Sequence, residues 1–228
     1  MNGNRDFMNM KNLCNHLVES KVIYSEKVFN TMLKVDRSLY CPSNPYYDHS
    51  QYINYNVVIS APHIHGHALE ALKDYCKPNS RVLDIGFGSG YLTVALSKLM
   101  DDQGLVVGIE HIPQLCEFGI NNIKKKEKKL IDDKKIILLQ ADGRLGCPSY
   151  APFNAIHVGA VAKELPQVFL DQLAPGGRLF IPIGKTDYDQ TIWIVDKDLN
   201  GKINIQKTWG VCYVPLTSAK EQLTNSSN

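Results

Sequence analysis

The chain has 228 residues, of which 44% are apolar and 21% charged, so it can form one globular domain with a substantial core. Its net charge of +2 at pH 7 gives no strong electrostatic attraction to nucleic acid or to a membrane surface, and neither partner is expected. No apolar run approaches the roughly 18 residues that a membrane-spanning helix requires.

The cysteines are spread along the chain without any Cys-x-x-Cys pair, which argues against a zinc ribbon and against thioredoxin-like chemistry. We expect free thiols and a reducing, cytoplasmic location. The first thirteen residues lack the apolar core of a secretory signal. A monomer is the default expectation. The six cysteines are Cys14, Cys41, Cys76, Cys116, Cys147 and Cys212.

The first quarter of the chain predicts a helical extension followed by a loop. Apolar residues recur at three- and four-residue spacing over 7–35, with Ser25 as a candidate N-cap for the second helix. Residues 41–56 are rich in Pro, Asn, Ser and Tyr and predict an irregular loop. A short β-branched run at 57–60 follows, and Pro62 is well suited to begin the next helix.

From residue 80 the pattern alternates between strands and helices, which predicts an α/β fold with a mostly parallel, doubly wound sheet. We expect one domain: an extension over 1–56, a core over 57–217 and a flexible polar tail over 218–228. A C-terminal antiparallel hairpin turns at 198–201. The expected strands are 81–86, 104–111, 135–143, 153–160, 176–184, 190–198 and 202–216, and the expected helices are 91–100, 113–125 and 165–173.

The segment LDIGFGSGYLT (83–93) has the position of a nucleotide-binding loop, because it follows an apolar strand and begins a helix. The dinucleotide fingerprint requires a third glycine where this chain has Tyr91. The loop glycines are instead Gly86, Gly88 and Gly90. An NAD site is therefore a poor fit.

Three carboxylates stand at the ends of three successive expected strands: Asp84, Glu110 and Asp142. The carboxyl ends of parallel strands meet at one crevice, where ligands bind. Asp84 would repel a phosphate but attract an ammonium group, Glu110 can accept both ribose hydroxyls, and Asp142 can accept the adenine amine. This pattern indicates S-adenosyl-L-methionine as the cofactor and a Rossmann-like methyltransferase fold.

Histidines stand at alternate positions in SAPHIHGH: His63, His65 and His67. This spacing does not place three rings on one helical face, and no carboxylate lies among them, so we expect no metal site. A nucleophilic Ser60–His pair lacks the Gly-x-Ser-x-Gly elbow. We expect His63 and His67 to be structural or surface residues.

Several segments together resemble protein-L-isoaspartate (D-aspartate) O-methyltransferases. The match runs from about residue 10 to Thr217, and VISAPHIHGHALEAL and the closing VPLT are its most specific parts. The resemblance implies a repair enzyme that methylates the α-carboxylate of L-isoaspartyl and D-aspartyl residues in damaged proteins, with S-adenosyl-L-methionine as donor and S-adenosyl-L-homocysteine as product.

The resemblance also implies the site. Ser60 is the expected catalytic residue, and relatives often have Thr at Val58, a smaller residue at Phe87 and Gly at Ala141. The expected cofactor-binding residues are Val57, Val58, Ile59, His65, Asp84, Gly86, Gly88, Ser89, Glu110, His111, Asp142, Gly143 and Thr217.

The chemistry explains why no base pair stands near the loop. A carboxylate acceptor is already ionised at pH 7, so its methylation needs positioning rather than proton removal. A neutral donor such as Ser60 can hold one carboxylate oxygen while the other attacks. Two alternatives remain: a methyltransferase for RNA or a small molecule, disfavoured because no basic stripe is present, and a non-catalytic cofactor-binding protein, disfavoured because all three carboxylates are present.

Overall fold

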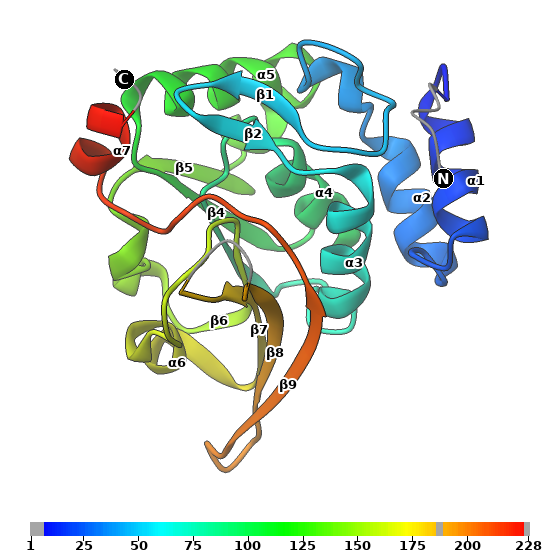
Figure 1. Cartoon of the computed structure of the whole chain (residues 1–228). Helices are drawn as coiled ribbons and strands as arrows, with labels where there is room; N and C mark the ends of the chain where they lie inside the picture. The colour runs from blue at the N-terminus through cyan, green and yellow to red at the C-terminus, as the bar shows by residue number, and fades with distance from the viewer. Residues whose placement is uncertain (1–6, 186–188, 226–228) are drawn as a thin grey trace.

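The computed structural model describes residues 7–185 and 189–225. Its central sheet has seven strands in the order β5-β4-β3-β6-β7-β8-β9 (Figure 1). The strands β3 to β7 run parallel, and β8 and β9 are antiparallel to their neighbours. Their bounds are β3 Arg81–Ile85, β4 Leu105–Glu110, β5 Ile136–Gln140, β6 Phe153–Val158, β7 Leu173–Ile183, β8 Thr191–Lys197 and β9 Ile203–Gly210.

The two faces of the sheet are covered unequally. Alternate strand residues such as Val82 and Val106 pack with helices α1 to α5 in one apolar cluster, while Leu83 and Val107 face a second cluster that includes α6. The inner strands β3, β4 and β6 are buried on both faces, which explains their almost continuous apolar runs, whereas β9 at the edge is mostly exposed. The helices are α1 Met10–Glu19, α2 Glu26–Lys34, α3 Pro62–Leu72, α4 Tyr91–Leu99, α5 Pro113–Asp132 and α6 Gln167–Gln172.

The N-terminal helices are attached to the core through a buried carboxylate. Ser25 caps α2 as predicted, its side chain accepting a hydrogen bond from the backbone N–H of Val28. Glu70 of α3 accepts three hydrogen bonds through one oxygen, from the backbone N–H groups of Tyr24 and Ser25 and from the Ser25 hydroxyl. Pro62 lies in the first turn of α3, also as predicted.

The predicted loop over 41–56 contains a strand that the composition did not reveal. β1 (Gln51–Asn54) pairs antiparallel with β2 (Val57–Ile59). Tyr55 and Asn56 both have φ of 54°, the left-handed conformation of a tight hairpin turn, which Asn adopts readily. Ile53 of β1 and Ile59 of β2 secure the hairpin to the core, but β1 is too short for an alternating pattern to be recognised.

The C-terminal hairpin turns as predicted, with the Gly201 N–H donating to the Asp198 carbonyl. β9 ends at Gly210 rather than at 216. The chain beyond it crosses the carboxyl ends of the parallel strands, where Val161 exchanges backbone hydrogen bonds with Val214 and Leu216 (Figure 1).

The expected flexible tail instead contains a short helix, α7 (Ala219–Asn225). The Ser218 hydroxyl accepts from the Glu221 N–H at its start, and the Glu221 carboxylate accepts from the Ser218 N–H in return. Gln222 reaches from α7 to His111 and to the Tyr55 carbonyl. Residues 226–228 of the predicted tail lie outside the described residues.

Candidate functional site

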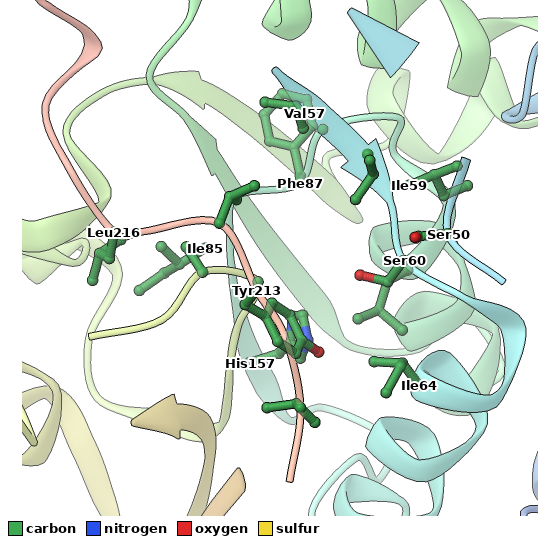
Figure 2. Close-up of a pocket in the computed structure, with 18 of the residues that line it drawn as sticks. Ser50, Val57, Ile59, Ser60, Ile64, Ile85, Phe87, His157, Tyr213 and Leu216 are labelled. Atoms are coloured by element: carbon green, nitrogen blue, oxygen red, sulfur yellow. The ribbon is translucent and has the colours of Figure 1, made fainter. Parts of the chain in front are cut away.

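A cavity of about 380 Å³ lies at the carboxyl ends of β3, β4 and β6. The β2–α3 segment and the crossing chain over 209–217 form its walls, and Figure 2 shows side chains from both converging on it. A crevice at this end of an open parallel sheet is the usual place for a ligand.

The structure brings the predicted site residues together, with one exception. Asp142 is absent from the cavity wall. The predicted residues that line it are Val57, Val58, Ile59, Ser60, His65, Asp84, Gly86, Gly88, Ser89, Glu110, His111, Gly143 and Thr217.

Asp142 is directed into its own turn instead. Its carboxylate accepts from the backbone N–H of Arg144, which caps the short helix Gly143–Leu145, and from the Arg144 guanidinium at 2.7–3.1 Å. The Arg144 guanidinium is also the main reason that the pKa of Asp142 lies below its usual range. The Asp142 carboxylate is therefore engaged by Arg144, and its adenine contact stays a prediction, while the adjacent Gly143 lines the cavity.

Asp84 is almost completely buried, and both of its oxygens have partners. The Thr93 hydroxyl donates to one oxygen at 2.6 Å, and Nδ1 of His157 lies 2.8 Å from the other. A direct role for Asp84 towards an ammonium group therefore has to be shared with these neighbours. His157 lines the cavity beside it.

Glu110 holds the glycine loop in place. One carboxylate oxygen accepts from the Gly88 N–H at 3.2 Å, and the other from the N–H groups of His111 and Ile112 at 2.8 and 3.1 Å. Burial raises the pKa of Glu110, and these three backbone donors oppose that rise. The Glu110 carboxylate therefore lies at the position expected to accept ribose hydroxyls.

The glycine loop depends on close approach to helix α5. Gly90 has φ of 85°, and a Cβ there would lie 2.8 Å from a side-chain carbon of Ile123. A Cβ on Gly119 of α5 would lie 2.5 Å from the Gly88 carbonyl oxygen and 2.7 Å from the Phe87 ring. Gly119 therefore provides the room that the bulky Phe87 requires.

Ser60 lies at the junction of β2 and α3, where it lines the cavity opposite the crossing chain. Figure 2 shows Tyr213 of the crossing chain and His157 of β6 on the side of the cavity away from the β2–α3 segment that carries Ser60. Burial of the Tyr213 hydroxyl raises the pKa of its phenol, and the Ser60 side chain lies close enough to oppose that rise. Two neutral hydroxyl groups are thereby placed at one point of the cavity.

The three histidines of the predicted triplet have three different partners. Nδ1 of His63 contacts the Asp48 carboxylate at 2.9 Å, Nδ1 of His65 contacts Arg37 at 3.2 Å, and the His67 ring lies 4.4 Å from the Trp209 ring. His63 and His67, which were expected to be structural or surface residues, also line the cavity. The residues that the structure describes contain no group of three or more His, Cys, Asp or Glu side chains placed to hold a metal.

The sequence analysis missed His157, Tyr213, Trp209 and Gln222, all of which line the cavity. His157 could have been found by the same reasoning as Asp84, because it too lies near the carboxyl end of an apolar strand. Trp209 lies at the end of β9, Tyr213 in the crossing chain and Gln222 in α7, and no local pattern positions these segments over the sheet.

Within the described residues, no helix has both the length and the apolar character needed to cross a membrane. Residues 8–221 match the family model for protein-L-isoaspartate(D-aspartate) O-methyltransferase.

Relatives of the same description cover nearly the whole chain. A protein-L-isoaspartate O-methyltransferase of Caenorhabditis elegans is 43% identical, with 92% of this chain and 93% of the relative covered. That of Triticum aestivum is 42% identical, with 94% of each covered. A Plasmodium falciparum crystal structure described as this methyltransferase in complex with S-adenosyl-L-homocysteine aligns with a TM-score of 0.86 at 37% identity, covering 92% of this chain and 98% of that one. The chain therefore belongs to the protein-L-isoaspartate (D-aspartate) O-methyltransferase family.

Proposed function

We propose that this chain transfers a methyl group from S-adenosyl-L-methionine to the α-carboxylate of L-isoaspartyl and D-aspartyl residues in damaged proteins and peptides. The observation that carries the proposal is one cavity in which Ser60 faces the glycine loop and the Asp84 and Glu110 carboxylates. The family to which the chain belongs has this activity in its name.

The donor set fits S-adenosyl-L-methionine better than a dinucleotide. Asp84 and Glu110 put negative charge beside the loop, where a pyrophosphate would be repelled and an ammonium group or a ribose diol favoured. When bound, the cofactor supplies an electrophilic methyl group on a sulfonium.

The chain's own residues position the groups around that methyl. His157 and Thr93 hold Asp84 in one orientation, and the three backbone donors do the same for Glu110. We assign Asp84, through His157, to the amino-acid end and Glu110 to the ribose. Gly143 and His111 are assigned to the adenine end, which Asp142 could reach only by leaving Arg144.

The acceptor carboxylate is already ionised, so the reaction needs no general base. In an in-line displacement, one carboxylate oxygen attacks the methyl carbon while the carbon–sulfur bond breaks and sulfur keeps the electron pair. The Ser60 hydroxyl, which lines the cavity together with Tyr213, can hold the other oxygen. A neutral donor suits this role because the acceptor loses its negative charge as the ester forms.

The polar and aromatic rim of the cavity is suited to a peptide. His63, His67 and Trp209 line it, and Val58 is 39% exposed on the hairpin beside it. Val58 offers no hydroxyl to the peptide, in contrast to the Thr common in relatives. We also propose a cytoplasmic monomer in which residues 57–217 form the catalytic core, which sedimentation analysis and cell fractionation would test.

One assay tests the function. The protein is incubated with methyl-labelled S-adenosyl-L-methionine and two peptides that differ only in carrying isoaspartate or aspartate. We expect base-labile methyl esters on the isoaspartyl peptide alone. Equal labelling of both peptides, or labelling of neither while transfer RNA accepts the methyl group, would overturn the proposal.

A further inference from the structure

Arg37 is a buried cation directly behind the cavity. Only 1% of its surface is exposed, and it lies in the short 3-10 helix Arg37–Leu39 that follows α2. Nη2 donates to the Ser60 carbonyl at 2.8 Å, and Nη1 lies 3.2 Å from Nδ1 of His65. One guanidinium therefore contacts both the expected catalytic serine and an expected cofactor-binding histidine.

The Arg37–His65 contact decides where the imidazole proton lies. A guanidinium has five N–H donors and no acceptor, so Nδ1 of His65 must be the accepting nitrogen. The proton of a neutral imidazole is then on Nε2, and His65 lines the cavity. Burial first, and the Arg37 charge second, lower the pKa of His65 well below its usual value, which agrees with a neutral ring.

The charge of Arg37 has no carboxylate partner within ion-pair distance among the described residues. Its guanidinium lies 5.6 Å from the centre of the Tyr91 ring, and its Nε has no hydrogen-bond partner in the described structure. Asp48, which acts on it through space, is already bonded to His63. Burying an unpaired charge is costly. Because no carboxylate pairs with the Arg37 guanidinium, its positive charge acts on the adjacent wall of the cavity.

We propose that Arg37 is the positioning residue of this site: it fixes His65 as the Nε2–H tautomer and anchors the Ser60 backbone, so that neutral donors backed by a buried positive charge face a carboxylate in the cavity. The inference rests on the proposed function, which supplies two such carboxylates. One belongs to the amino-acid end of the cofactor and the other to the acceptor residue.

In this arrangement the Arg37 charge attracts a carboxylate in the cavity without touching it. A cation touching the acceptor would hold negative charge that methyl transfer must remove. Arg37 instead acts through His65 and the Ser60 backbone, polarising neutral donors in a region of low dielectric. Tyr91, which occupies the position of the third fingerprint glycine, packs against both Arg37 and His65 and fixes their relative positions.

The tautomer is tested by nitrogen NMR of the histidine side chains in the wild-type protein, with the His65 signals assigned by comparison with His65→Gln. We expect a pyridine-like Nδ1 and a protonated Nε2. A protonated Nδ1 on His65 in the folded wild-type protein would overturn the proposal. This measurement does not depend on activity.

The role in binding is tested with Arg37→Met, which keeps the volume, and Arg37→Lys, which keeps the charge. We expect Arg37→Met to weaken carboxylate binding by roughly tenfold to a hundredfold, the range for a hydrogen bond to a charged group. Arg37→Lys should recover part of the loss. Arg81→Met removes an exposed arginine from the opposite end of β3. This control variant should change neither the Kd of S-adenosyl-L-homocysteine nor the KM of the peptide.

Two arms distinguish the carboxylates. If the cofactor carboxylate is held, Arg37→Met raises the Kd of S-adenosyl-L-homocysteine but not that of its neutral carboxamide. If the acceptor is held, the peptide KM rises while the Kd is unchanged. Folded Arg37→Met protein with both constants within about twofold of wild type would overturn the proposal. If wild-type protein binds S-adenosyl-L-homocysteine but methylates no isoaspartyl peptide, the proposed function fails while the Kd arm still tests Arg37.

Discussion

His157 and Asp84 are register partners on the neighbouring parallel strands β6 and β3, and Nδ1 of His157 lies 2.8 Å from Oδ1 of Asp84. Both residues are buried, and the Thr93 hydroxyl occupies the other oxygen of Asp84. The acidic residue that introduces the glycine loop is therefore the centre of a small polar network, and its orientation is set by the adjacent strand.

The first prediction concerns this network. His157→Ala leaves one oxygen of a buried carboxylate without its donor, which typically costs a few kcal/mol. We expect a lower melting temperature and S-adenosyl-L-homocysteine binding weakened by about tenfold or more, measured by calorimetry. His157→Asn can keep a donor near the Nδ1 position and should retain most of the stability. Equal losses in the two variants would contradict this account.

Ser60→Ala tests the acceptor contact. Removing the hydroxyl should lower kcat for an isoaspartyl peptide by roughly tenfold to a hundredfold, because one donor to a charged oxygen is lost. Binding of S-adenosyl-L-homocysteine should be unchanged. Near-normal turnover in initial-rate measurements would show that Ser60 does not hold the acceptor.

Gly90→Ala tests the tight contact between the glycine loop and α5. Gly90 and Gly201 have φ of 85° and 86°, but a Cβ at Gly201 would meet nothing within 4 Å. We expect Gly201→Ala to cost about 1–2 kcal/mol from backbone strain alone. Gly90→Ala should cost roughly 1–3 kcal/mol more, because of the clash with Ile123. Chemical denaturation measures the difference, and equal costs would contradict it.

Gln222→Ala tests whether α7 contributes to the site. Oε1 of Gln222 lies 2.7 Å from Nε2 of His111, at the end of the cavity assigned to adenine. Loss of this contact should weaken S-adenosyl-L-homocysteine binding by about threefold to tenfold. The control is Thr224→Ala, whose hydroxyl donates only within α7 to the Lys220 carbonyl. If the two variants bind alike, α7 has no part in cofactor binding.

The pH dependence of stability provides a test of His65. Its pKa in the folded protein lies well below the ordinary value, so below about pH 6.5 the unfolded chain binds a proton that the folded chain does not. Stability should therefore fall as the pH is lowered through 6.5. His65→Gln should show a smaller fall in stability than the wild-type protein when denaturation is measured between pH 5 and pH 7. An unchanged slope in His65→Gln would contradict a buried neutral imidazole.

Local patterns were sufficient for most of the fold because the inner strands of the sheet are buried on both faces. The alternation of apolar strands and amphipathic helices predicted β3 to β9, and the Pro62 and Ser25 helix starts are confirmed. The strand β1, and with it the β1–β2 hairpin, was missed because β1 is only four residues long and mostly polar or aromatic. The helix α7 was missed because its polar sequence has no apolar face to signal packing.

The expectation that carboxylates at the ends of parallel strands meet at one crevice describes two of the three residues. Asp84 and Glu110 do converge on the cavity, since parallel strands end at the same edge of a sheet. Asp142 obeys the same rule, yet its side chain is captured by Arg144 two residues later. Whether a carboxylate bonds within its own turn or faces the shared crevice depends on the direction of its side chain, which residue spacing alone does not give.

The sequence by itself determined the fold class, the family and part of the cavity wall, because strand ends, loop glycines and family motifs are encoded locally. Only the tertiary structure decided the arrangement behind that wall. Arg37, His157 and Tyr213 come from segments far apart in the chain, and their roles follow from contacts across the core. Long-range packing fixes which nitrogen carries a proton and which carboxylate is already engaged, and no local pattern records either.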